Sequence, residues 1–420
     1  MLKRITDHDA IRQLGPGLIT GAADDDPSGI ATYSQAGAQF GFNMLWTIVL
    51  TYPLMVGIQT VSARMGRITG KGLAANIRTV FPRPVLLGII GLLVVANTIN
   101  IAADIGAMAQ ALGLIMGGSE HIHAVVFGFV SLVLQIFMPY ERYVRFLKWL
   151  TLALLAYVAV VFTVQVPWTE VLMRTVWPRF TFNSESITLI VAVFGTTISP
   201  YLFFWQATHE AQDVRSDPNA QPLVDSPDQA KAHLRRIKWD TYIGMGFSNL
   251  IAFFIILSTA VTLHAAGVVR IETAAQAAEA LRPIAGELTF MLFALGIIGT
   301  GMLAVPVLAG SAAYAVAEAF DWQTGLDRKL FEAKEFYAIV TLATAGGALL
   351  GFTPIDPIKA LIWSAVINGF IAVPIMAVMM VLAQRPDVMG QFVVTPRLRL
   401  LGWAATLVML VAVVAMVATF

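Results

Sequence analysis

Three consecutive aspartates, Asp24, Asp25 and Asp26, interrupt an apolar stretch near the start of the chain, and Pro27 follows them directly. Carboxylates at membrane depth are energetically expensive and usually face a cavity or a partner. Proline removes a backbone hydrogen-bond donor and clashes with the preceding helical turn. Such an unwound point is tolerated in a membrane only where the freed backbone groups line a polar cavity. The stretch therefore predicts a broken helix with an acidic side chain at a binding site.

A second interrupted stretch, FGTTISPYLFFWQATHE (194–210), has small polar residues and a proline in the middle of another apolar segment. Two Gly/Pro-interrupted segments at corresponding positions of two halves are the best sequence pointer to the binding site of a secondary transporter. The simpler alternative is that the prolines only kink two membrane helices. The two breaks together favour a substrate site between them.

Eleven apolar segments are long enough to position these breaks in a membrane. The chain has 420 residues, of which 57% are hydrophobic and 13% are charged, whereas soluble domains carry about 25% charged residues. A helix needs about 20 mostly apolar residues to cross a bilayer. The predicted spans are 13–40, 43–63, 84–114, 122–140, 146–166, 186–211, 241–264, 284–319, 335–353, 357–383 and 399–420.

The basic residues support this topology, because short cytoplasmic loops of membrane proteins are rich in Lys and Arg. With a cytoplasmic N-terminus, the predicted outer face receives few of the 27 basic residues, namely Arg174, Arg179, Arg270, Arg282 and Lys359. The pattern predicts one multi-pass domain over residues 1–420 in a plasma membrane of the bacterial inner-membrane type, surrounded by lipid.

Composition also excludes several classes of function. The net charge of +1 offers nucleic acid nothing to recognise, and the absence of cysteine removes disulfides, thiolate metal sites and thiol nucleophiles. The sequence carries no hydrolytic motif, phosphate-binding loop or nucleophile arrangement. We therefore expect neither an enzyme nor a protein with a resident cofactor.

The first broken segment, GPGLITGAADDDPSGIATYSQAGAQFG (15–41), resembles the first helix of the Nramp family of divalent-metal transporters. The resemblance continues weakly through NIAADIG, WDTYIGMGFSNL and FALGIIGTGMLAVPVLAGSAAYAVAEAF. It implies an all-α, LeuT-type fold of eleven helices with helices one and six broken. Two inverted five-helix repeats, near 13–166 and 186–383, would be followed by one extra helix at 399–420. The resemblance also implies that the protein works as a monomer.

The departures from the family pattern concern the ion ligands. Asp26 and Pro27 match the family motif, but Ser28 and Gly29 replace the glycine and the asparagine that follow in the family. In the sixth helix Ser199 replaces a methionine. These changes remove an amide ligand and a thioether, and they make the chain similar to the Nramp-related magnesium transporters.

Other departures concern proton coupling. Gln206 stands where the family has a second histidine in the sixth helix, and Asp104 matches the third-helix aspartate, but its acidic partner is Ala107. The ninth segment lacks the arginines of the family's proton pathway. Weak or absent proton coupling is therefore expected.

The remaining ligands predict a site made of oxygen atoms. Oxygen ligands suit Mg²⁺, Ca²⁺ or Mn²⁺, and Mg²⁺ often keeps several waters beside one or two carboxylates. The predicted substrate-binding residues are Asp26, Ser28, Gly29, Thr196, Thr197, Ser199 and Asn368. Asp24, Asp25, Asp104 and Gln206 are candidates for coupling or for the ion pathway. The predicted substrate is a hydrated hard divalent cation, Mg²⁺ foremost and Mn²⁺ next.

Alternatives remain open for the function and for the residues. On the same fold, the chain could be a proton-coupled Mn²⁺/Fe²⁺ importer. It could also carry a small anion or polar solute such as bicarbonate, with a coupling ion such as Na⁺ held at the acidic break. Asp26 could instead cap the unwound backbone, and Thr196 and Ser199 could satisfy freed backbone groups. Asn368 could hold two helices together.

Overall fold

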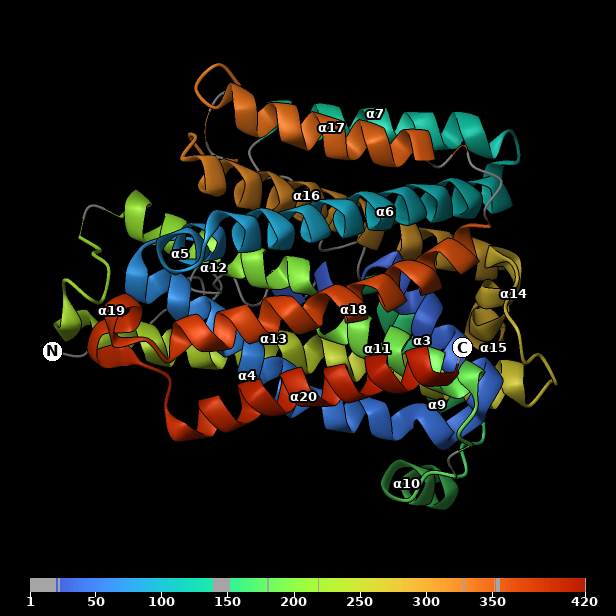
Figure 1. The fold of residues 1–420 in the computed structure, drawn as a ribbon. Helices are drawn as coiled ribbons and strands as arrows, with labels where there is room; N and C mark the ends of the chain where they lie inside the picture. The colour runs from blue at the N-terminus through green and yellow to red at the C-terminus, as the bar shows by residue number, and fades with distance from the viewer. Residues whose placement is uncertain are drawn as a thin grey trace, which may run out of the picture.

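The computed structural model describes residues 20–138 and 152–419, except for residues 22, 180, 218, 327, 329, 351 and 353–355. All regular secondary structure in this part of the chain is helical. Most long helices run side by side along one direction (Figure 1). They are α3 (Pro27–Phe40), α4 (Leu45–Thr69), α6 (Arg83–Met116), α7 (Glu120–Phe137), α9 (Leu155–Thr163), α11 (Ser184–Thr197), α12 (Pro200–Ser216), α13 (Ala230–Thr259), α16 (Thr289–Phe320), α17 (Lys334–Leu350), α18 (Pro357–Ala383) and α20 (Pro396–Thr419).

The described residues place a helix within each of the eleven predicted spans. Within the described residues, eight helical runs are long and apolar enough to cross a membrane, or nine if the bent pair 152–163 and 168–176 is one span. The number is lower than eleven partly because the 3₁₀ turn η1 (Gly41–Met44) joins α3 and α4 into one run. In addition, α17 has only 17 residues. The parts of the predicted spans at 13–19 and 139–151 lie outside the described residues.

Both predicted helix breaks are present. Before α3, Asp25 is a bend and Asp26 is an extended N-cap residue with φ −71° and ψ 170°. In the sixth span, α11 ends at Thr197 and α12 begins at Pro200. A proline at the first helical position has no N–H that the helix could use, so each proline begins a new helix after the break.

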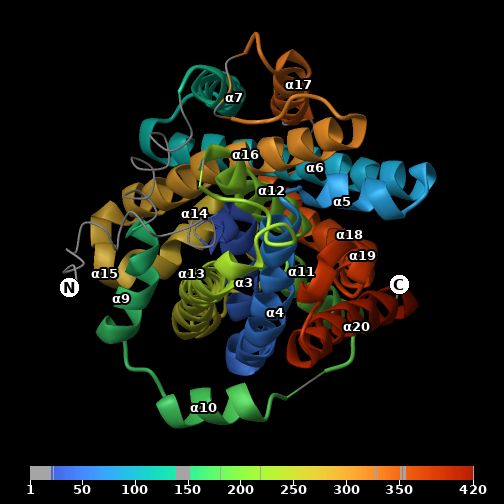
Figure 2. The same ribbon diagram turned by 90° about the vertical axis from the view of Figure 1, so that its left-hand side faces the viewer.

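The broken helices lie at the centre of the bundle. Seen along the bundle, α3 and α11 lie among α4, α13 and α18, while α16 and α6 separate this group from α7 and α17 (Figure 2). The run from α11 to α12 is almost entirely buried, whereas α7 and α20 expose most of their side chains. In a membrane, the exposed apolar faces of the peripheral helices would contact lipid, and the polar residues of the breaks would be shielded from it.

Two glycines allow the halves of the sixth span to approach different neighbours. A Cβ atom at Gly195 in α11 would lie 2.0 Å from the carbonyl oxygen of Ala365 in α18. A Cβ atom at Gly66 in α4 would lie 2.0 Å from the carbonyl oxygen of Ala207 in α12. Small residues permit such backbone contact between membrane helices. Thus α11 packs directly on α18, and α12 packs directly on α4.

The short helices lie at the two ends of the bundle. The helices α5 (Leu73–Val80) and α19 (Pro386–Met389) lie at one end, and α10 (Trp168–Val176), α14 (Ala274–Ala278) and α15 (Arg282–Ala285) lie at the other (Figure 1). The basic residues predicted to be outside on α10 and α15 are therefore separated from those near α5 and α19. The N-terminal residues, predicted to be cytoplasmic, lie outside the described part of the chain.

Candidate functional site

Asp26 is the N-cap of α3 and accepts hydrogen bonds on both carboxylate oxygens. Its Oδ1 accepts from the Gly29 amide and from the Ser28 hydroxyl, each at 2.7 Å. Its Oδ2 lies 3.0 Å from Asn100 Nδ2 and 3.4 Å from the Tyr201 hydroxyl. The residue is 1% exposed. The carboxylate therefore lies at the positive end of the α3 dipole and is held by donors from three helices.

Asn100 and Tyr201 were not among the predicted site residues. Asn100 lies on α6 between Asn97 and Asp104, and this spacing of three and four residues places all three on one face of the helix. That polar stripe in an apolar helix was a signal that could have been used. Tyr201, the second residue of α12, also lies 3.2 Å from the Ala23 carbonyl oxygen, so its hydroxyl connects α12 to the first break.

Asp24 and Asp25 contact a different helix from Asp26. The Ser248 hydroxyl on α13 lies 2.6 Å from Asp24 Oδ2 and 3.0 Å from Asp25 Oδ1. Both carboxylates are buried, and Asp24 Oδ1 has no hydrogen-bond partner among the described residues. The same residues contain no group of three or more Asp, Glu or His side chains that could hold a metal ion together. The three consecutive aspartates therefore do not converge on one point.

The second break is stabilised by hydroxyl groups that bond to backbone carbonyls. Ser199 is the N-cap of α12, and its hydroxyl lies 2.7 Å from the Thr196 carbonyl oxygen and 3.0 Å from that of Gly195. The Thr197 hydroxyl donates to the Val193 carbonyl oxygen of its own helix at 2.8 Å. The Ser199 contacts satisfy carbonyls of the last turn of α11, where helical amide partners are missing.

The two breaks meet at Gly29 and Thr196. A Cβ atom at Gly29 would lie 3.2 Å from Thr196 Oγ1 and 3.3 Å from the Tyr33 ring. The absence of a side chain at Gly29 therefore brings the first turn of α3 against the end of α11. Asp26, Ser28, Gly29, Thr196 and Ser199 all lie in the region where the two breaks meet.

The other candidate residues are also buried. Neither carboxylate oxygen of Asp104 and neither polar atom of the Asn368 amide has a hydrogen-bond partner in the described structure. Gln206 accepts a hydrogen bond from Gln59 of α4 and donates to the Thr241 hydroxyl of α13 at 3.3 Å. In this conformation Gln206 joins α12 to its neighbours.

The site is closed at the end where α14 and α15 lie. The Gln35 side chain of α3 accepts from the Ile271 amide at 2.9 Å and donates to the Val269 carbonyl oxygen at 3.1 Å. These two bonds hold the segment before α14 against α3. Arg270 in this segment also forms a 2.6 Å ion pair with Glu185 at the start of α11.

The site is also closed toward the opposite end of the bundle. Gln59 and Ser62 of α4 donate to the carbonyl oxygens of Leu202 and Phe203 at 3.0 and 2.6 Å. Farther along α12, Glu210 forms a 2.5 Å ion pair with Arg236 of α13, and the Glu210 side chain is fully buried. Closure at both ends explains why Asp26 has almost no contact with solvent.

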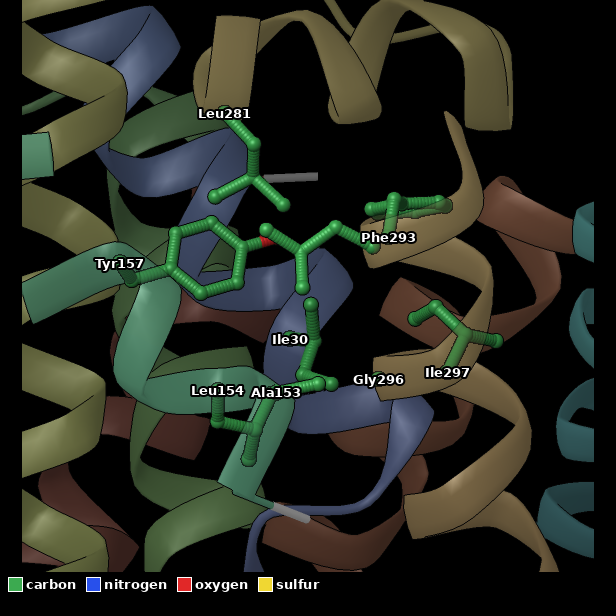
Figure 3. Close-up of a pocket in the computed structure, with 9 residues that line it drawn as sticks. Ile30, Ala153, Leu154, Tyr157, Leu281, Phe293, Gly296 and Ile297 are labelled. Carbon is green, nitrogen blue, oxygen red and sulfur yellow. The ribbon is translucent and has the colours of Figure 1, made fainter. Parts of the chain in front are cut away.

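An apolar pocket lies beside the first turns of α3 (Figure 3). Ile30, one turn after Asp26, lines it together with Tyr157, Leu281, Phe293 and Ile297. Its lining is almost entirely aliphatic or aromatic, so it offers an ion few ligands.

Comparison with known proteins identifies the family of the chain. The family model described as natural resistance-associated macrophage protein-like, Nramp, matches residues 17–419. The divalent metal cation transporter MntH of Klebsiella pneumoniae is 27% identical over 402 residues, which cover 93% of this chain and 90% of that protein. MntH of Mycobacterium tuberculosis is 28% identical over 386 residues, which cover 90% and 84%.

The structure matches that of a manganese transporter from Eremococcus coleocola with a TM-score of 0.75 at 16% identity, covering 100% of this chain and 89% of that chain. The match at this identity shows the fold, which is the predicted LeuT-type arrangement with helices one and six broken. The family model extends over almost the whole sequence, including both breaks. The chain therefore belongs to the Nramp family.

Proposed function

We propose that this protein is a secondary transporter that takes up a divalent metal cation through a site centred on Asp26. The observation that carries the proposal is a fully buried carboxylate at an unwound point, next to the second break. A buried carboxylate without a cationic side chain beside it attracts a cation. The similar proteins named divalent metal cation transporters support the same class of substrate.

We infer that Mn²⁺ is the transported ion. The polar atoms near the two breaks are oxygens of Asp26, Thr196 and Ser199, with Asn368 as a further candidate, and oxygen ligands favour Mg²⁺, Ca²⁺ and Mn²⁺ over softer metals. The similar transporter of known structure is described as a manganese transporter. Mn²⁺ is the ion that agrees with both lines of support.

Mg²⁺ is the second candidate, and the observation that favours it is the serine at position 199. This side chain supplies no sulfur, and its hydroxyl lies against backbone carbonyls in the present conformation. A site without a thioether loses preference for softer ions. Gly29 and Ser199 are smaller than the asparagine and methionine of the family pattern, and the space that they leave would accommodate waters that Mg²⁺ retains.

Transport requires the two closures to open in turn. Release of the Gln35 bonds to residues 269 and 271 would connect Asp26 to one side of the membrane. Movement of α12 away from Arg236 of α13 would connect it to the other. The ninth-span helix α17 contains no arginine, so we propose uptake driven by the membrane potential with weak proton coupling.

Uptake into proteoliposomes tests the proposal, with Mn²⁺, Mg²⁺ and bicarbonate compared in parallel, with and without a pH gradient or a Na⁺ gradient. We expect saturable Mn²⁺ uptake that is lost in Asp26→Asn and retained in the control Asp387→Asn, which changes an exposed carboxylate paired with Arg385. Bicarbonate flux without divalent-cation flux would contradict the proposal. Mg²⁺ uptake in preference to Mn²⁺ would select the second candidate.

A further inference from the structure

Four buried side-chain oxygen atoms on α6 have no hydrogen-bond donor among the described residues, and they belong to Asn97, Asn100 and Asp104. Three of the four are Asn100 Oδ1, on the residue that contacts Asp26, and the two carboxylate oxygens of Asp104, one turn later. Both side chains are completely buried. A buried oxygen without a partner loses its hydration without compensation. These atoms therefore need a donor or a cation that completes the site.

The geometry places Asn100 directly beside Asp26. The Asn100 amide donates to Asp26 Oδ2 at 3.0 Å, so its oxygen lies in the same small space. Asp104 follows Asn100 by four residues and lies on the same face of α6. Asp26 and Asp104 are both buried. No ion pair with Lys, Arg or His compensates either carboxylate in the described part of the chain.

We propose that α6 supplies part of the cation site, with Asn100 as a direct ligand and Asp104 as its second carboxylate. In this conformation Asn100 donates an N–H to Asp26. Rotation of the amide by half a turn exchanges Nδ2 and Oδ1, so the same residue would present its oxygen to an ion bound to Asp26. This inference rests on the proposed function and extends the same site.

The charges of the ligands define the class of ion. Two carboxylates that share one site would be neutralised by one divalent cation, whereas Na⁺ would leave a net negative charge in a buried site. The amide oxygen adds a third hard ligand without adding charge, and waters would complete the octahedral shell that Mg²⁺ prefers. The extended site therefore takes a hard divalent cation that remains partly hydrated.

The neighbouring asparagine on α6 provides a matched control. Asn97 lies three residues before Asn100, but its amide donates to the Leu308 carbonyl oxygen and to the Ser311 hydroxyl, both at 2.8 Å. Asn97 therefore joins α6 to α16. Its replacement removes a buried amide from the same helix without touching Asp26.

The test is direct titration of the full-length protein, in lipid nanodiscs, with Mn²⁺, using electron paramagnetic resonance to measure the free ion. We expect Asn100→Leu and Asp104→Asn each to weaken Mn²⁺ binding by about 10- to 100-fold, the range found when groups around a metal site are removed. Asn100→Asp should tighten binding, because the number of charged ligands tunes affinity. Asn97→Ala should bind Mn²⁺ as the unchanged protein does.

Thermal unfolding without Mn²⁺ identifies variants that fail to fold. Asn100→Leu and Asn100→Asp are expected to change Mn²⁺ affinity in opposite directions, so either variant alone can test the role of Asn100 if the other fails to fold. Unchanged binding in Asn100→Leu and Asp104→Asn, together with lost binding in Asp26→Asn, would refute the role of α6 and leave the proposed function intact. If the unchanged protein bound neither Mn²⁺ nor Mg²⁺, both the role of α6 and the proposed function would be refuted.

Discussion

The two helix breaks solve the same structural problem with opposite chemistry. At the first break a carboxylate, Asp26, accepts hydrogen bonds from the donors at the start of α3. At the second break a hydroxyl, Ser199, donates to the carbonyl oxygens at the end of α11. The first break therefore carries a formal charge at the centre of the bundle, and the second carries only dipoles.

This difference assigns different tasks to the two breaks. A carboxylate can exchange its hydrogen-bond donors for a cation, since both are attracted to the same oxygen atoms. The carbonyl oxygens of Gly195 and Thr196 become available only when the Ser199 hydroxyl turns away. We therefore expect changes at the first break to alter ion binding most, and changes at the second to alter ion preference and stability.

The largest effect is expected at the first break. Asp26→Ala should abolish Mn²⁺ uptake. The uptake rate should fall by more than roughly 100-fold, which is the upper end of the loss seen when groups around a metal site are mutated. It should also remove a helix cap, at a cost of about 0.5–2 kcal/mol. Transport in proteoliposomes and thermal unfolding measure the two effects separately. If a folded Asp26→Ala variant still took up Mn²⁺, transport would not depend on the charge at the first break.

Changes that restore the family residues should shift ion preference. Ser199→Met introduces a sulfur ligand, so Cd²⁺ should compete with Mn²⁺ more effectively than in the unchanged protein. Adding Gly29→Asn should move selectivity further from Mg²⁺ toward Mn²⁺. Because a Cβ at Gly29 would lie only 3.2 Å from Thr196 Oγ1, the double variant requires a small shift of α11. Competition for uptake checks the prediction, and an unchanged order of ions would place the site elsewhere.

A smaller change should affect mainly stability. Ser199→Ala leaves two carbonyl oxygens at the end of α11 without their hydroxyl partner, and an unsatisfied buried polar group costs about 1–3 kcal/mol. We expect a lower unfolding temperature with Mn²⁺ affinity altered far less than in Asp26→Ala. Denaturation and Mn²⁺ titration of the same preparation distinguish the effects. A loss of affinity as large as that in Asp26→Ala would make the two breaks equivalent ligands.

The smallest effect is expected where the breaks touch. Tyr201→Phe removes the hydroxyl near Asp26 Oδ2 and the Ala23 carbonyl oxygen but leaves the ring in place. A typical hydrogen bond contributes about 0.5–1.5 kcal/mol, so we expect a modest fall in stability and continued Mn²⁺ uptake. Complete loss of uptake in folded Tyr201→Phe would show that the phenol is itself required for transport.

Much of this arrangement could be predicted from sequence because prolines and glycines mark backbone interruptions. The positions of Pro27 and Pro200 predicted both breaks, and the apolar segments predicted where helices would form. The joining of α3 and α4 through η1 was not predictable, because the apolar pattern gives no angle between successive helices. The structure describes one continuous 43-residue run there.

The partners of the acidic residues were harder to predict. Neighbouring residues in a bend can point in different directions, so the sequence could not separate Asp26 from Asp24 and Asp25. Their contacts with α6, α12 and α13 depend on packing between segments that are far apart in the chain. Asn100 was overlooked because an asparagine in a membrane helix is equally suited to joining two helices.

The backbone contacts of Gly195 and Gly66 have a mechanical consequence. They attach α11 to α18 and α12 to α4, so the residues between Thr197 and Pro200 act as a joint between two rigid pairs. The 17 residues of α12 form a lever about 25 Å long, and a rotation of about 10° at the joint moves its far end by about 4 Å. Glu210, about 15 Å from the joint, would move by about 2.6 Å in the same rotation, which is enough to separate it from Arg236, 2.5 Å away. A slight rotation at the second break would therefore be amplified at the distant end of α12.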